Sequence, residues 1–207
     1  MIGVPPPGGI TLRFASVTDV DAVAALHADR IAEGFLVTLG PAFLRRLYRR
    51  IAGSRGAFVL VADSSSRNAA PRRVCGFIAV AENTGALYRE FLLRDGVAAA
   101  VAATRGVARE PLAVWETLRY GLRGGDHASG AEVLATVVAA DCAGEGIGTR
   151  LVRTAVEELR RRGTASARVV TAVGNVGATK AYERGGFRAD GTFEVHRGVP
   201  QQLLVWP

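Results

Sequence analysis

A glycine-rich loop between a strand-like run and a helical pattern constrains the fold of this chain more than any other segment. The run at 132–138 is apolar and rich in β-branched residues, and the loop after it carries Gly144, Gly146 and Gly148 at every second position. Glycine lets the backbone turn sharply and present its N–H groups to an anion, and the positive end of a following helix dipole adds to that attraction. The segment therefore predicts a strand–loop–helix unit with a phosphate-binding loop.

The elements around this unit predict an α/β (α+β) fold with one mixed sheet and helices on both faces. An amphipathic helix at 146–162 ends at Gly163 and a strand follows at 167–173, which implies a right-handed parallel crossover. A strand at 10–14, two helices and an antiparallel hairpin of strands at 57–62 and 74–81 come first. Residues 83–130, in which Pro111 begins a second helix, are predicted to form a helical insertion between the third and fourth strands.

The segment from Phe187 onward supplies the final strands. We expect the last of them, over 203–206, to be exposed and able to pair across a dimer interface, so the protein is expected to be a monomer or a homodimer.

Composition narrows the class of protein. A chain of 207 residues with 49% hydrophobic and 22% charged residues suits a single globular domain, placed at 10–207 after a short disordered lead-in at 1–9. No apolar run approaches the roughly 18–20 residues of a spanning helix, and the N-terminal segment lacks the features of a signal peptide. Cys75 and Cys142 stand in separate strand-like contexts without metal-ligand spacing, so we expect a reduced cytoplasmic compartment, no membrane partner and no metal.

The net charge of +7 raises the question of a nucleic-acid partner. Lys180 is the only lysine, so arginine supplies 25 of the 26 basic residues, and the arginines are spread along helices with no basic tail. This distribution favours solvated helix faces and a small acidic ligand over nucleic-acid binding.

Two common phosphate-loop interpretations fail on particulars. A dinucleotide fold places the glycines after the first strand and an acidic residue about 20 residues later, whereas this loop lies deep in the chain and no such acid ends the strand at 167–173. A nucleotidase P-loop requires Gly-Lys-Ser/Thr, and the loop contains no lysine.

A third interpretation fits two motifs together. The loop resembles motif A of the GCN5-related N-acetyltransferase (GNAT) family, whose usual form is Arg/Gln-x-x-Gly-x-Gly/Ala after a strand. Residues 175–187 resemble that family's motif B, Asn-x-x-Ala-x-x-x-Tyr-x-x-x-Gly-Phe, at every fixed position. The order and spacing of the two motifs are also similar to those of the family. The resemblance implies a central mixed, mostly antiparallel, twisted sheet and a bacterial acetyl-CoA-dependent acetyltransferase.

The resemblance also implies which residues hold acetyl-CoA. The strand would pair with the pantetheine arm, the loop would bind the pyrophosphate, and Asn175 would contact the pantetheine or the loop. Ala143 departs from the family pattern, which has Arg or Gln there; Arg150 is the nearest compensating cation, and Lys180 or Arg184 is a candidate for the 3′-phosphate. The implied cofactor-binding residues are Thr136, Val137, Val138, Ala143, Gly144, Glu145, Gly146, Ile147, Gly148, Thr149, Asn175 and Tyr182.

Two residues are candidates for the catalytic groups. By resemblance, Tyr182 would present its hydroxyl to the departing sulfur as a general acid; the alternative is a tyrosine that only packs in the core. Glu132 is the candidate base, and six residues before Val138 it is expected to share that residue's sheet face. The alternatives are an exposed glutamate at a strand start and, for Asn175, a simple helix N-cap. We interpret His27 as a helix-packing residue, and Cys142 has no identifiable activating partner.

Together these features predict an N-acetyltransferase that moves the acetyl group of acetyl-CoA to a primary amine by direct attack in a ternary complex. The expected acceptor is a small molecule or an amino sugar. Two alternatives stay open: acetylation of a protein or peptide amine, and a CoA-binding regulatory module without catalysis.

Overall fold

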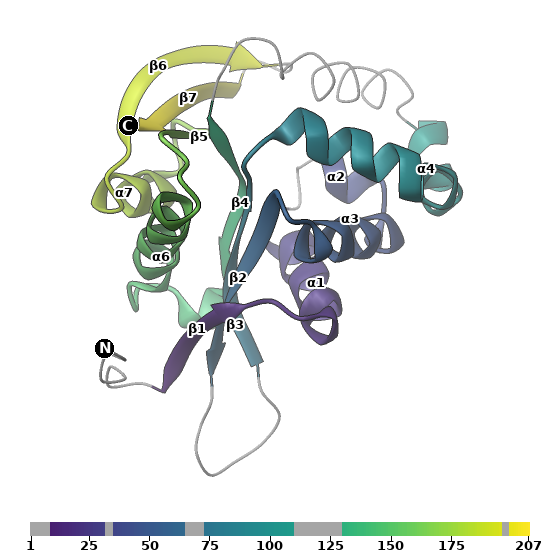
Figure 1. Ribbon diagram of the computed structural model, residues 1–207, viewed down its shortest axis with the longest axis horizontal. Coiled ribbons are helices and arrows are strands. Elements are labelled where there is room, and N and C mark those ends of the chain that lie inside the picture. The colour runs from purple at the N-terminus through teal and green to yellow at the C-terminus, as the bar shows by residue number, and fades with distance from the viewer. Residues whose placement is uncertain (1–8, 32–34, 65–72, 110–129, 196–198) are drawn as a thin grey trace.

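The computed structural model describes residues 9–31, 35–64, 73–109, 130–195 and 199–207, and Figure 1 shows how they are arranged. Seven strands form one twisted sheet in the order β1-β2-β3-β4-β5-β7-β6. Among the described strands, β4 and β5 are the one parallel pair, and all other neighbours are antiparallel. The expected mixed, mostly antiparallel sheet is thus confirmed. The strands are β1 (Ile10–Phe14), β2 (Ala57–Ser64), β3 (Arg73–Ala81), β4 (Ala131–Val138), β5 (Ala167–Ala172), β6 (Arg188–Val195) and β7 (Val199–Trp206).

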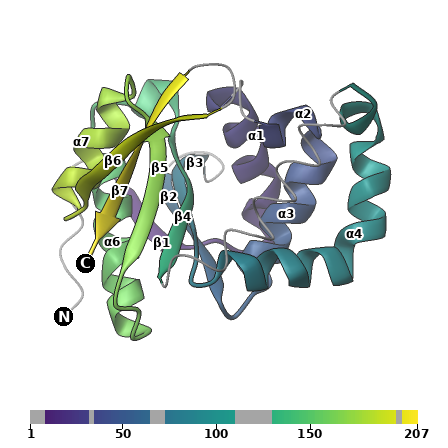
Figure 2. The same ribbon diagram turned by 90° about the horizontal axis from the view of Figure 1, so that it is seen from above.

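Helices cover both faces of the sheet. Figure 2 shows α6 and α7 on one side and α1, α3 and α4 on the other. The helices are α1 (Val20–Arg30), α2 (Phe35–Thr38), α3 (Pro41–Gly53), α4 (Thr84–Arg109), α6 (Ile147–Arg161) and α7 (Val176–Arg184), with two 3-10 turns, η1 (Val17–Asp19) and η2 (Ala140–Cys142). As expected, α4 inserts a helix between the third and fourth strands. The predicted second helix of that insertion, like most of the predicted N-terminal lead-in, lies outside the described residues.

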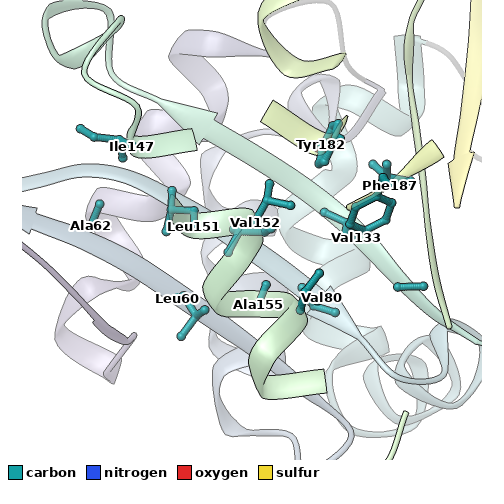
Figure 3. Close-up of a cluster of buried hydrophobic side chains, with 14 of the residues drawn as sticks. Leu60, Ala62, Val80, Val133, Ile147, Leu151, Val152, Ala155, Tyr182 and Phe187 are labelled. Atoms are coloured by element: carbon teal, nitrogen blue, oxygen red, sulfur yellow. The ribbon is translucent and has the colours of Figure 1, made fainter. Parts of the chain in front are cut away.

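The amphipathic helix α6 organises one of two cores, which we call the α6-side core. Its apolar face packs on strands from both halves of the sheet, because Leu60 and Val80 lie in the same buried cluster as Val169 and Leu204. Figure 3 shows Leu151, Val152 and Ala155 of α6 in this cluster, with Tyr182 and Phe187 beside Val133 of β4.

The end of α7 approaches α6 so closely that a side chain does not fit between them. A Cβ added at Gly185 would lie 2.2 Å from Cγ1 of Val152. The glycine before the final Gly-Phe of the C-terminal motif therefore has a packing role.

The opposite face of the sheet carries a second cluster, the α1-side core. It combines residues of α1 and α3 with inward residues of β2 and β3, among them Phe77. His27 of α1 is buried there, its Nδ1 lies 2.5 Å from the Tyr48 hydroxyl, and its ring stacks on Phe77. Burial lowers the pKa of His27, so the ring is neutral in the core. His27 packs between helix and sheet, as the sequence indicates.

A β-bulge in β4 changes which side chains face each core. In the β3–β4 ladder Ala79 pairs with Ala135 and Val80 with Val133, which leaves Leu134 as an extra residue. Before the bulge Ala131 and Val133 belong to the α6-side core, whereas after it Ala135 and Val137 belong to the α1-side core. The bulge therefore reverses the alternation of the strand.

Two expectations are wrong for reasons of topology. The final strand β7 is not exposed at an edge, because it pairs with β5 on one side and with β6 on the other. It therefore offers no free edge for a dimer, and β6 is the edge strand at that end of the sheet. Glu132 does not share a face with Val138, because the bulge lies between them: Glu132 pairs with Ala81 of the α1-side core, whereas Val138 packs against the α6-side core.

No helix in the described part of the chain is both long and apolar enough to cross a membrane.

Candidate functional site

The glycine loop connects β4 to α6 through η2 and has the geometry of an anion cradle. Gly144 and Gly146 have φ angles of 85° and 74°, in the left-handed region that favours glycine, and a Cβ at either position would meet no atom within 4 Å. Gly146 is the N-cap of α6, and the N–H of Arg150 donates the first helical bond to its carbonyl at 3.1 Å. The earlier N–H groups of the first turn have no acceptor within the helix, so they can bind an anion.

A gap in the sheet begins beside the loop. The strands β4 and β5 pair only at their first residues, Ala131 with Ala167 and Glu132 with Arg168. Beyond that point the edge of β4 that faces β5 has no partner strand among the described residues, although β4 continues to Val138. An extended chain with amide groups can therefore hydrogen-bond to β4 in this gap, as an additional strand does.

Tyr182 of α7 lies on the α6 side of this gap. Its side chain is buried, with 4% of its surface exposed, and its ring packs against Phe187 at a centroid distance of 5.6 Å. Burial raises the pKa of the Tyr182 hydroxyl to about 12, and the neighbouring Thr136 hydroxyl partly offsets that effect. Tyr182 is therefore a core residue whose hydroxyl lies near Thr136 of β4, and its role as a general acid stays a prediction.

The other sequence-predicted residues lie around the loop and gap. Val137 is buried in the α1-side core, Val138 packs on the α6-side core, and Ile147 is fully buried under the loop. Asn175 caps α7, because its Oδ1 accepts a hydrogen bond from the Ala178 N–H at 3.1 Å. Glu145 is exposed at the tip of the loop.

Glu132 lies at the narrow end of the gap, on the α1 side of the sheet. Its Oε2 accepts hydrogen bonds from Nη2 and Nε of Arg168, at 2.9 and 3.2 Å, and from the Thr84 hydroxyl at 3.2 Å. The side chains of Glu132 and Arg168 are 26% and 29% exposed, so the pair is reachable from solvent. The pKa of Tyr88 on α4 is raised to about 12, mainly by burial and to a smaller extent by the negative charge of Glu132. The phenol of Tyr88 is therefore near that carboxylate.

Sequence reasoning missed Arg168, Thr84 and Tyr88. Glu132 is the first residue of the predicted strand at 132–138 and Arg168 the second of the predicted strand at 167–173. Because the two strands were expected to be parallel neighbours, pairing of their first residues was the available signal. Thr84 and Tyr88 come from α4, whose position over the sheet has no signature in the sequence.

Two cations near the loop, Arg150 and Arg73, already have partners. Arg150 donates from Nη2 to the Ile10 carbonyl of β1 at 3.0 Å, so it is directed toward β1 rather than into the place of the side chain missing at Ala143. Arg73, at the start of β3, forms an exposed bidentate ion pair with Asp141 two residues before Ala143. Backbone N–H groups are therefore the main anion donors that the loop itself offers.

The thiol nearest the loop is not an activated nucleophile. Cys142 is buried in the α6-side core, and burial together with the adjacent Cys75 thiol raises its pKa to about 12. Within the described ranges, no three His, Cys, Asp or Glu side chains are grouped so as to hold a metal ion.

A hollow of about 650 Å³ lies elsewhere, between the end of α3 and the beginning of α4. It is at the opposite end of β3 from the loop and is lined by charged and polar side chains, several of them already paired with one another. The hollow is therefore separate from the loop, and it begins next to Ala81 and Thr84, which pair with and bond to Glu132. The polar lining residues include Arg50, Ser54, Glu82, Asn83, Glu90 and Arg94.

Comparison with known proteins is consistent with this geometry. The model of the acetyltransferase (GNAT) family matches residues 74–187, a little more than half of the chain, from β3 to the residue after α7 and its Gly-Gly turn. No curated protein sequence is detectably similar.

Similar solved structures are named for, or are in complex with, different amine compounds or proteins. They include AAC(6')-Ib in complex with Parmomycin and acetyl-CoA (15% identity, 96% of this chain and 93% of that chain covered, TM-score 0.55). A second is the ribosomal-protein-S18-alanine N-acetyltransferase from Escherichia coli (13%, 96% and 93%, 0.57). A third is a variant of the SpeG spermidine N-acetyltransferase from Vibrio cholerae (15%, 95% and 92%, 0.57). At these identities the likeness shows a shared fold.

Proposed function

Because the chain belongs to the GNAT acetyltransferase family, we propose that it transfers the acetyl group of acetyl-CoA to a primary amine by direct attack in a ternary complex. One observation carries the proposal. The bulge at Leu134 puts Glu132 on the α1 side of the sheet and Thr136, the neighbour of Tyr182, on the α6 side, and both residues belong to the strand that borders the gap. In this proposal the base for the incoming amine and the acid for the departing sulfur would act from opposite faces of the sheet.

The residues around the gap fit acetyl-CoA. The open space over Gly144 and Gly146, with the free N–H groups of the first turn of α6, suits a pyrophosphate. The unpaired edge of β4 over residues 133–138 suits the amides of pantetheine, and an N–H there would polarise the thioester carbonyl. Ala143, Glu145 and Thr149 would contribute their backbone groups to the loop, and Asn175 would hold the start of α7 beside it.

The chain's own groups would move the protons. An amine attacks only in its neutral form, so Glu132 would accept the amine proton directly or through an ordered water. Arg168 and Thr84 hold Oε2 of that carboxylate and so fix its orientation. Tyr182 would donate its proton to the departing sulfur. The buried and protonated Cys142 supports direct attack rather than an acetyl–enzyme intermediate.

We propose a small amine or an amino sugar as the acceptor. The Thr84–Glu132–Tyr88 group offers a carboxylate and a phenol that an ammonium or a hydroxylated amine can hydrogen-bond. A second candidate function, a CoA-binding regulatory module without catalysis, is favoured by Ala143 and Glu145, which give the loop no cation and one negative charge.

Two measurements on the purified chain test the proposal. Calorimetry with CoA and acetyl-CoA should show saturable binding, and its absence would reject both functions. Release of free thiol from acetyl-CoA should then depend on an added amine from a panel of spermidine, glucosamine, paromomycin, benzylamine and a peptide with an N-terminal alanine. Binding without amine-dependent release would favour the regulatory module, and release with the peptide alone would identify a peptide acceptor.

A further inference from the structure

A buried hydroxyl next to Tyr182 has no hydrogen-bond partner. The Oγ1 atom of Thr136 is inaccessible to solvent and makes no hydrogen bond of normal geometry within the described residues, although it lies close enough to the Tyr182 hydroxyl to lower that group's pKa. A buried polar atom without a partner costs on the order of 1–3 kcal/mol, so native proteins rarely keep one without a function. A valine has nearly the same shape as a threonine and would avoid that cost.

The bulge in β4 is the reason that this hydroxyl faces Tyr182. Thr136 lies between Ala135 and Val137, which both belong to the α1-side core, so its side chain points to the α6 side. On that side Val133 lies beside Tyr182 in Figure 3. Farther along β4, Val138 is close to α7, because a Cβ added at Gly148 would touch both Val138 and Ala181. Thr136 lies between these two contacts along β4 and pairs with Ile78, which belongs to the same cluster as Tyr182.

The Tyr182 hydroxyl needs a donor only while it acts as an acid. In the resting protein the phenol is neutral, and its oxygen gains little from a further donor. When its proton passes to the departing sulfur, a negative oxygen is left in a buried site, where an ionised group without a partner is strongly disfavoured. A hydrogen bond to an ionised acceptor is about twice as strong as a neutral one.

We propose that Thr136 is a positioning residue for the general acid, and that its hydroxyl donates a hydrogen bond to Oη of Tyr182 while the thiolate is protonated. This inference rests on the proposed function. The proton of Tyr182 moves to the sulfur of CoA, the proton of Thr136 stays on Oγ1 and is shared with the phenolate oxygen, and solvent restores the phenol after CoA leaves. The role concerns the side-chain hydroxyl and is separate from backbone pairing of Thr136 with pantetheine.

Three variants separate this role from simple packing: Thr136→Val, which removes the hydroxyl and keeps the shape; Thr136→Ser, which keeps the hydroxyl; and Thr136→Val combined with Tyr182→Phe. The assay is thiol release with the panel amine that the wild-type protein acetylates fastest. Thr136→Val should lower kcat about tenfold and leave the calorimetric Kd for CoA within about twofold, and Thr136→Ser should recover most of the loss. Thr136→Val should melt at the same temperature as wild type or higher, since it removes an unpaired buried hydroxyl.

The double variant decides whether the effect passes through Tyr182. In a Tyr182→Phe background the Val substitution should leave the residual kcat unchanged, because the hydroxyl it would serve is gone. Full activity of Thr136→Val, or an equal loss in both backgrounds, would overturn the proposal. If Thr136→Val does not fold, a low kcat in Thr136→Ser with normal CoA binding would overturn it as well. A wild-type protein that releases no thiol would instead reject the proposed function on which the inference rests.

Discussion

Glu132 and Arg168 form the last cross-strand pair before β4 and β5 separate, and their side chains are joined by an ion pair of 2.9 Å. The position where the gap opens is thus also the position where a carboxylate is held by a guanidinium. The carboxylate is fixed on one oxygen by Arg168 and Thr84 together.

The first prediction tests Glu132 as the base. Glu132→Gln should lower kcat at least tenfold, because the amide cannot accept a proton. Arg168→Gln should give a smaller loss, since it releases the orientation of the carboxylate without removing it. Glu157→Gln, an exposed position on α6, is the matched control. Wild-type rates in Glu132→Gln would exclude Glu132 from the reaction.

The second prediction concerns the acid. Tyr182→Phe should lower kcat by about tenfold or more and leave the Kd for CoA nearly unchanged, because the ring still packs against Phe187. Steady-state kinetics and calorimetry on the same preparation separate the two effects. Equal kcat in wild type and variant would remove Tyr182 from the mechanism.

The third prediction concerns the negative charge in the loop. Glu145→Gln should raise the affinity for CoA about threefold at low salt, because it removes a carboxylate beside the phosphates. The gain should shrink in 0.5 M salt, where the Debye length falls to about 4 Å and the charges are screened. Ala143→Arg should increase the affinity further. Glu157→Gln again serves as the control. A weaker affinity in Glu145→Gln would mean that this carboxylate contacts the cofactor favourably.

The fourth prediction is a pH dependence of stability. Burial lowers the pKa of His27 in the folded protein below its usual value of about 6.5, so the unfolded state takes up a proton more readily than the folded state. The contribution of His27 to the free energy of unfolding is therefore complete above that usual value and is lost progressively as the pH falls below it. Urea unfolding between pH 8 and pH 5 should show this loss. The decline should persist when His127 and His196 are replaced by glutamine, and persistence in His27→Gln would contradict the assignment.

The fifth prediction concerns the contact between α6 and α7. Gly185→Ala should lower the free energy of unfolding by about 2 kcal/mol, because its methyl group would overlap Val152. Gly177→Ala on the same helix is the matched control: its Cβ would meet no atom within 4 Å, so we expect no loss and a gain of up to about 1 kcal/mol. Urea unfolding of both variants measures the difference, and equal stability would contradict the close approach.

Local patterns were sufficient to predict much of the fold and of the loop. The glycines, the amphipathic helix after them and the motif around Asn175 and Tyr182 are local signals, and the structure has a loop, α6 and α7 at those positions. The face of Glu132 was not predictable in this way. It depends on a one-residue bulge at Leu134, which the register with β3 imposes and which a period-two count does not detect.

The place of β7 in the sheet was not predictable either. The last strand of the chain inserts between β5 and β6, a choice of topology that leaves the sequence of the strand itself unchanged. Arg168 was missed for a related reason, since its partner is fixed only when two distant strands come into register.

The two-residue pairing between β4 and β5 also makes the sheet mechanically uneven. One block of strands, β1 to β4, carries α1, α3 and the candidate base, while the other, β5, β7 and β6, lies next to α7 and the candidate acid. In the described structure the main connection between the two blocks consists of the two residue pairs of β4 with β5 and the packing of α6 on both blocks. The spacing between the candidate base and the candidate acid therefore depends on a narrow connection. A substitution at Ala131 or Ala167, whose side chains take no part in the proposed proton transfers, would change catalysis by altering the angle between the blocks.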